Sequence, residues 1–160
     1  LYNVPGRTGC SIPVSVVERL SKHPNIVGIK EASGDMSYAM KIARCVGSDF
    51  ALYSGNDDIT VPLMSIGGSG VISVYANVMP AMCHQIVDDY LHGRQDQAVA
   101  NHLKYLQLMN DLFLEVNPIP VKTAMNLLGL NVGPMRLPLC EMSEANAAVL
   151  RATMEEAGLL

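Results

Sequence analysis

The most informative part of this chain is the run Ile26-Val27-Gly28-Ile29-Lys30-Glu31-Ala32. Its apolar start is typical of a strand that is buried on both faces, as the strands of parallel sheets are. Because side chains alternate along a strand, Ile26, Gly28 and Lys30 share one face. Gly28 has no side chain, so we expect open space on that face beside Lys30.

Lys30 is an unusual residue for such a strand, because an ammonium group inside a sheet is costly unless it is paired or neutral. A lysine withdrawn from water loses its proton more readily, and its free amine can attack a carbonyl carbon to form a Schiff base. Alternatively, Lys30 lies at the strand's end and extends into water beside Glu31. The pattern alone leaves both interpretations open.

Outward from this segment, strand-like and helix-like runs alternate. The strand-like runs are 1–4, 26–32, 50–54 and 71–75, and the helix-like runs between them are 15–20, 37–46 and 59–66. Asp35 and Asp58 stand just before the second and third helical runs, where a carboxylate can cap free N–H groups. This alternation predicts an α/β fold with βαβ units and a parallel sheet, either a barrel or a doubly wound sheet.

After residue 75 the pattern predicts only helices. Apolar side chains recur at helical spacing over 79–91, 98–114 and 121–128. A last helix is expected from Ser143 as its N-cap to Gly158 as its stop, and the run Asn117-Pro118-Ile119-Pro120 is a rigid break.

Composition excludes several classes of protein. The chain has 160 residues, of which 49% are hydrophobic and 16% charged, so it has enough apolar material for a core. The net charge of -4 and the absence of a Lys/Arg run argue against nucleic acid as a partner, and no apolar run is long enough for a membrane span. The four cysteines, Cys10, Cys45, Cys83 and Cys140, are scattered, so we expect reduced core residues in a cytoplasmic protein and no metal site.

A second candidate site lies in Leu1-Tyr2-Asn3-Val4-Pro5-Gly6-Arg7-Thr8-Gly9. Tyr2 stands at the end of a predicted strand, and an expected Pro5-Gly6 turn that carries Arg7 follows it. A phenol that can relay a proton and a guanidinium that fits a carboxylate therefore share one loop. The structural alternative is that Tyr2 belongs to the core and Arg7 is a solvated charge. Ser54-Gly55-Asn56-Asp57-Asp58 also follows a strand and can present backbone groups to a ligand, whereas Gly67-Gly68-Ser69-Gly70 is expected to be a tight turn.

These motifs occur together, in order and with matching spacing, in a known family. Four runs of the chain resemble the C-terminal half of the dihydrodipicolinate synthase family. They are Tyr2 to Gly9, Gly28-Ile29-Lys30-Glu31-Ala32, Leu52-Tyr53-Ser54-Gly55-Asn56-Asp57 and Gly67-Gly68-Ser69-Gly70-Val71-Ile72-Ser73-Val74. The runs 117–122 and 137–139 extend the resemblance over essentially the whole chain. It implies the last four strands of a (β/α)8 TIM barrel, with half-barrel βα units over 1–78, and the last barrel helix with a helical appendix over 79–160.

The resemblance also implies a reaction. Lys30 would form an imine with pyruvate, and the resulting enamine would add to L-aspartate-4-semialdehyde to give 4-hydroxy-tetrahydrodipicolinate for lysine and diaminopimelate biosynthesis. Tyr2 would relay protons beside the imine, Arg7 would hold the carboxylate of the aldehyde, and Gly55 and Ile72 would line the pyruvate pocket. No cofactor or metal is implied, and the family is commonly a cytoplasmic homotetramer.

Other interpretations stay open. N-acetylneuraminate lyase and the keto-deoxy-sugar aldolases share the lysine and the tyrosine loop, although Arg7-Thr8-Gly9 is more similar to the synthase pattern.

Family members also carry an N-terminal portion with a Gly-Thr-Thr-Gly-Glu-type loop and a second tyrosine, and neither appears here. A barrel of this kind needs about 250 residues. We therefore expect a fragment whose family activity belongs to the complete chain; the alternative is a catalytically silent, self-associating half-barrel. A lysine that carries pyridoxal phosphate is a third possibility, and no feature of the sequence requires it.

Overall fold

The computed structural model describes all residues from Leu1 to Leu160. They divide into two compact units, Leu1–Ser73 and Val74–Leu160. The first unit contains all four strands, and the second is helical. No helix combines the length and the apolar composition that crossing a bilayer requires.

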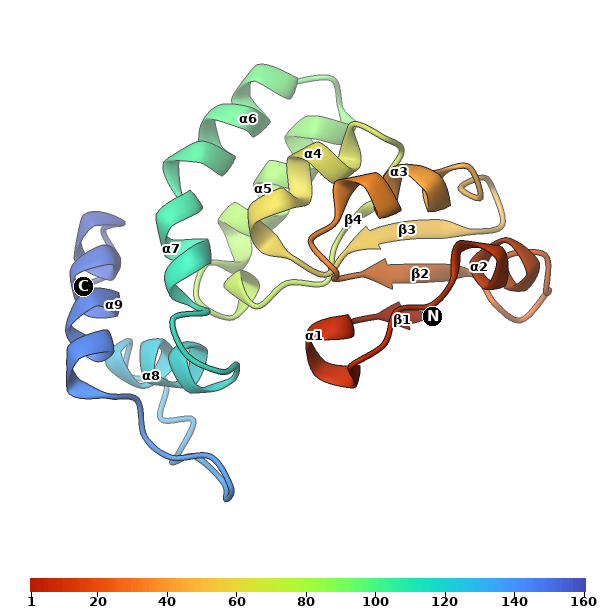
Figure 1. Cartoon of the computed structure of the whole chain (residues 1–160). Coiled ribbons are helices and arrows are strands. Elements are labelled where there is room, and N and C mark those ends of the chain that lie inside the picture. The colour runs from red at the N-terminus through yellow and green to blue at the C-terminus, as the bar shows by residue number, and fades with distance from the viewer. The chain divides into compact units, whose positions relative to one another are not determined.

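A four-stranded parallel sheet forms the centre of the first unit, in the order β1-β2-β3-β4 (Figure 1). The strands are β1 (Tyr2–Asn3), β2 (Gly28–Glu31), β3 (Ala51–Ser54) and β4 (Gly70–Val71). The helices are α1 (Pro5–Thr8), α2 (Val14–Leu20), α3 (Met36–Ala43) and α4 (Thr60–Met64), with the 3-10 helix η1 (Asp57–Ile59) before α4. The predicted α/β class with a parallel sheet is therefore confirmed.

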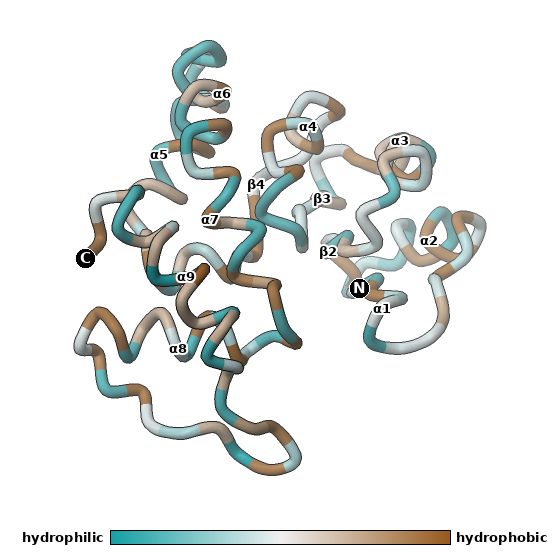
Figure 2. The backbone as a smooth tube through the Cα atoms, turned by 60° about the vertical axis from the view of Figure 1, so that its left-hand side comes forward, coloured by the Kyte–Doolittle hydropathy of each residue, from teal (hydrophilic) through white to brown (hydrophobic).

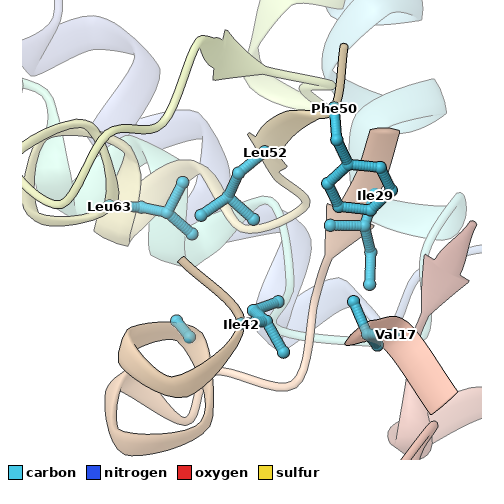
Figure 3. Packing of buried hydrophobic residues seen from close by; sticks show 7 residues of the cluster. Val17, Ile29, Ile42, Phe50, Leu52 and Leu63 are labelled. Atoms are coloured by element: carbon cyan, nitrogen blue, oxygen red, sulfur yellow. The ribbon is translucent and has the colours of Figure 1, made fainter. Parts of the chain in front are cut away.

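The apolar core of this unit lies between one face of the sheet and the helices α2, α3 and α4 (Figure 3). Its buried members are Val17, Ile29, Ala39, Ile42, Phe50, Leu52 and Leu63. Ile29 and Leu52 are opposite each other on β2 and β3, and burying each such side chain stabilises the fold by about 1.5–3 kcal/mol. Because strand residues alternate, the neighbouring Lys30 and Tyr53 project from the opposite face.

Two segments of the first 78 residues differ from the sequence-based expectation. The strand expected over 71–75 comprises Gly70–Val71, and Tyr75, which is fully buried, begins the 3-10 helix η2 (Tyr75–Asn77). The Pro5-Gly6 pair, expected as a turn, begins α1, because proline suits the first position of a helix.

The predicted helix caps are partly confirmed. Asp35 caps α3, and its carboxylate accepts a hydrogen bond of 3.1 Å from the backbone N–H of Tyr38. Asp58 was expected to cap the next helix, but it lies inside η1, and the residue before α4 is Ile59. Because η1 precedes α4, Asp58 lies one residue before the N-cap position of α4, which Ile59 occupies.

The second unit begins with η2 and continues with five helices. They are α5 (Pro80–Leu91), α6 (Gln95–Lys104), α7 (Leu106–Asp111), α8 (Ile119–Leu127) and α9 (Glu144–Glu156). Helix α5 packs against α6, and α9 packs against α7 and α8. The tube of α6 is teal along much of its length in Figure 2, as expected for a helix with one solvated face.

Two expectations for this part of the chain are corrected. The single helix expected over 98–114 is two helices, because the chain leaves the helical conformation at Tyr105, with φ -104° and ψ 9°. All four cysteines are free, but only Cys83 is buried, whereas Cys10 and Cys140 are exposed rather than core residues. Ser143 caps α9 as predicted, and its hydroxyl accepts from the backbone N–H of Asn146 at 3.4 Å.

Candidate functional site

A row of four residues crosses the sheet at the level of Lys30. Tyr2 is opposite Lys30, Lys30 is opposite Tyr53, and Tyr53 is opposite Gly70. Paired residues of neighbouring strands project from the same face, so this row lies on the face turned away from the apolar core. Tyr2 is 49% exposed and Tyr53 is 37% exposed, so this face is open to solvent.

The amine of Lys30 lies against the ring of Tyr2. The distance from Lys30 Nζ to the ring centroid is 4.4 Å, within the range of a cation–π contact. The backbone N–H of Lys30 donates to Leu1 O at 3.0 Å, which continues the ladder between β1 and β2. Lys30 is half-buried, so its amine is neither enclosed in the core nor extended freely into water. The structure thus brings together the phenol and the amine that the sequence singles out.

Gly55 lies beside the stem of Lys30. It follows β3 directly, and its backbone N–H donates to Glu31 O at 2.6 Å. A Cβ atom built on Gly55 would lie 3.0 Å from Lys30 Cε and 2.5 Å from Ala32 Cβ. Any residue other than glycine at position 55 would therefore force the Lys30 side chain or its neighbours to move.

Gly28 has a different role from the one expected. The sequence suggests that it leaves space beside Lys30 for a small molecule. A Cβ atom on Gly28 would lie 2.8 Å from the carbonyl oxygen of Ala51 on β3. The missing side chain therefore permits β3 to lie close to the beginning of β2.

Ile72 and Arg7 complete the set of predicted site residues. The backbone N–H of Ile72 donates to Ser54 O at 2.8 Å and so extends the pairing of β3 with β4 by one residue. Ile72 is 49% exposed, and alternation places it on the same face as Gly70. Arg7 is exposed on α1, which begins two residues after β1. Of the five, Tyr2, Lys30 and Gly55 lie together, and Arg7 is held on a separate short helix.

Three further residues of the region were missed by sequence reasoning. Tyr53 is opposite Lys30 and precedes Gly55 by two residues, on the open face. An alignment of the two predicted strands would have paired it with Lys30. Asn3 and Glu31 lie opposite each other on the helix-covered face and are each 1% exposed. The sequence feature that could have identified each of them is a polar residue at a strand position where alternation predicts an apolar one.

A separate hollow lies at the other end of the sheet, where the strands begin. Its volume is about 590 Å³, and its lining includes Glu18, Lys22, Arg44 and Asp49. In parallel βα architectures ligands bind where the strands end, which is the end that carries Lys30 and Gly55. The row of residues around Lys30 is therefore the better candidate site.

Comparison with known proteins places this geometry in a wider context. Residues 1–157 match the model of the Dihydrodipicolinate synthetase family. The chain is 50% identical over 160 residues to a 4-hydroxy-tetrahydrodipicolinate synthase of Clostridium perfringens, covering all of this chain and 55% of that protein. It is 51% identical over 161 residues to the synthase of the same name from Thermoanaerobacter sp., covering all of this chain and 54% of the relative.

Solved structures show the same similarity. The dihydrodipicolinate synthase from Cyanidioschyzon merolae, crystallised with lysine bound, is 42% identical with a TM-score of 0.95, over 100% of this chain and 54% of that one. The Thermotoga maritima enzyme is also 42% identical with a TM-score of 0.95, over 99% of this chain and 55% of that one. The chain therefore spans about half the length of the proteins that it matches.

Proposed function

This chain belongs to the dihydrodipicolinate synthetase family, and on that premise we propose that Lys30 is the amine that forms a Schiff base with pyruvate. The observation that carries the proposal is the position of Lys30 Nζ, 4.4 Å from the ring centroid of Tyr2 on the open face of the sheet. A lysine near the end of a parallel strand, on its open face, is placed where βα-barrel enzymes do their chemistry.

The proposed reaction joins pyruvate to L-aspartate-4-semialdehyde. The amine of Lys30 attacks the ketone carbon, and loss of water gives an imine. Loss of a methyl proton turns the imine into an enamine, whose carbon attacks the aldehyde carbon of the second substrate. The amino group of that substrate then displaces Lys30 from the imine, which closes the ring of 4-hydroxy-tetrahydrodipicolinate and frees the lysine.

The other site residues have supporting roles in this proposal. The hydroxyl of Tyr2 relays protons to and from the imine, and the contact of the Tyr2 ring with Nζ supports this role. Arg7 binds the carboxylate of the aldehyde substrate through its guanidinium. Gly55 and Ile72 bound the space for pyruvate. All five residues fall within 1–78, the part proposed to supply the barrel strands, and 79–160 supplies the last barrel helix and the appendix.

Partners and location belong to the same proposal. The partners are pyruvate, the aldehyde and further copies of the chain, in a homotetramer. The cytoplasm is the proposed location, because the named relatives are biosynthetic enzymes. The pathway supplied is that of lysine and diaminopimelate.

Borohydride trapping with pyruvate tests the proposal. We expect a reduced pyruvyl adduct on the peptide that contains Lys30, located by mass spectrometry. Lys30→Arg should abolish the adduct, and Lys22→Arg should leave it unchanged, because Lys22 lines the hollow at the other end of the sheet. An unlabelled Lys30 in the complete protein, with the Clostridium perfringens relative labelled in parallel, would refute the proposed role.

A further inference from the structure

A buried polar pair lies on the helix-covered side of β1 and β2, behind the row that contains Lys30. Asn3 and Glu31 are opposite each other, and each is 1% exposed. Asn3 Nδ2 donates to Glu31 Oε2 at 2.7 Å, and the backbone N–H of Ser33 donates to Glu31 Oε1 at 2.6 Å. A buried carboxylate is costly unless its oxygens accept hydrogen bonds, and here both do.

The pair is connected to Ile12, the residue at which the segment after β1 returns to the sheet. Asn3 Oδ1 accepts from the backbone N–H of Ile12 at 2.9 Å. The hydroxyl of Tyr38 donates to Ile12 O at 2.7 Å, so both backbone polar groups of Ile12 are held. Burial first, then the negative charge of Glu31 and then Cys45, raise the pKa of Tyr38 to about 12, so this hydroxyl stays protonated well into the alkaline range.

The middle of this segment lies at the surface. Residues 6–11 are all exposed, so no apolar side chain among them anchors the segment in the core. The hydroxyl of Thr8 bonds to Val4 O and Cys10 O, which shapes the segment internally without tying it to the sheet. At the two ends of the segment, Asn3 is buried on β1, and Ile12 packs against the apolar core in addition to its hydrogen bonds to Asn3 and Tyr38.

We propose that Glu31 and Asn3 are a positioning pair that holds residues 4–12, and through them Arg7, in place for the carboxylate of the aldehyde substrate. The inference rests on the proposed function for the role of Arg7, and it adds a specific cause for the placement of that guanidinium. It also separates two functions on adjacent residues of β2: Lys30 forms the bond to pyruvate, and Glu31 orients the binding of the second substrate.

Glu31→Gln tests this role, because an amide can accept at only one of the two positions. The new amide nitrogen has to face the amide of Asn3, and Asn3 satisfies it only by turning its oxygen away from the N–H of Ile12. In the complete protein we expect the KM for the aldehyde to rise by about 10-fold to 100-fold. Trapping of pyruvate at Lys30 should persist, and the amide of Ile12 should exchange with deuterium faster.

The double variant Asn3→Asp with Glu31→Gln provides the matched rescue. The carboxylate introduced at position 3 can accept from both Ile12 N–H and the new side-chain amide, whose oxygen still accepts from Ser33. The buried charge moves to the neighbouring strand and all hydrogen bonds are restored. We expect the aldehyde KM and the exchange rate of Ile12 to return close to those of the unchanged protein. Tyr38→Phe, which removes one support of Ile12 without touching the charge, should raise the same KM less.

These experiments separate the two proposals. Glu31→Gln with an unchanged aldehyde KM and unchanged exchange at Ile12 would overturn the positioning role, as would a folded double variant without rescue. If Glu31→Gln does not fold, an unchanged aldehyde KM in Tyr38→Phe would overturn it instead. A failure of pyruvate trapping in the unchanged protein would overturn the proposed function alone, because exchange at Ile12 still reports on the pair.

Discussion

Gly55 shows how little space surrounds the stem of Lys30. A methyl group there would meet Ala32 Cβ at 2.5 Å, and both Glu31 O and Lys30 Cε at 3.0 Å. Contacts this close force the backbone or the lysine to move. The site therefore depends on a missing side chain as much as on those that are present.

Gly55→Ala is expected to destabilise the fold by about 1–3 kcal/mol and to slow the trapping of pyruvate at Lys30. Denaturant unfolding measures the first effect and timed borohydride quenching the second. Gly47→Ala is the control, because a Cβ atom there has no heavy atom within 4 Å; its stability should change by less than about 0.5 kcal/mol. Equal stability and equal trapping rates for the two variants would show that a side chain at position 55 does not disturb Lys30.

Lys30 and Glu31 show what alternation along a strand can do. The two residues are adjacent in the sequence, yet Lys30 projects to the open face and Glu31 to the face covered by helices. A single four-residue strand therefore supplies an amine on the open face and a buried hydrogen-bond acceptor on the other.

The start of α9 depends on a carboxylate from the segment after α7. Glu115 Oε1 accepts from Asn146 Nδ2 at 2.8 Å, from the backbone N–H of Ser143 at 3.0 Å and from the Ser143 hydroxyl at 2.8 Å. These bonds, that of Asn146 first, lower the pKa of Glu115 below its ordinary value of 4.5. An ionised Glu115 therefore stabilises the junction between its segment and the first turn of α9.

The lowered pKa of Glu115 predicts a dependence of stability on pH. Its contribution is fully present above pH 4.5, its ordinary pKa, and is lost as the pH falls through the lower value of the folded protein. Glu115→Gln should lower the melting temperature at neutral pH, and the difference from the unchanged protein should shrink below pH 4.5. Thermal unfolding over a pH series measures this, with the exposed Glu156→Gln on α9 as the control. A melting-temperature difference that is the same at neutral and acidic pH would argue against the role of the charge.

Sequence patterns predict elements well where a local signal marks them. The strand over 26–32 and the cap at Ser143 follow from alternation and from capping chemistry, and both are present. The break at Tyr105 was missed, because no proline or glycine interrupts the helical spacing there. The Asn3–Glu31 pair was missed because it joins residues 28 positions apart, and only the register of β1 and β2 brings them together.

Taken as a whole, the first unit leaves one face of a parallel sheet open. Tyr2 and Ile72 are each 49% exposed on it, and Tyr53 is 37% exposed. Parallel sheets are normally covered on both faces. In a (β/α)8 barrel, the face turned away from the helices is filled by side chains from alternate strands. The match to synthases of nearly twice this length agrees with such an interior, in which further strands would complete the row around Lys30.

Residues 1–160 by themselves are therefore expected to self-associate. β1 and β4 are the edges of the sheet, and edge strands carry unpaired backbone groups that bind other chains. Sedimentation velocity should show a sedimentation coefficient that rises with concentration. Ile72→Lys should weaken the association, since charge on an edge blocks pairing, whereas Leu137→Lys, at a position 93% exposed in the second unit, should not. A compact monomer at every concentration, with cooperative unfolding, would show that the open face and the edges are stable in water as they stand.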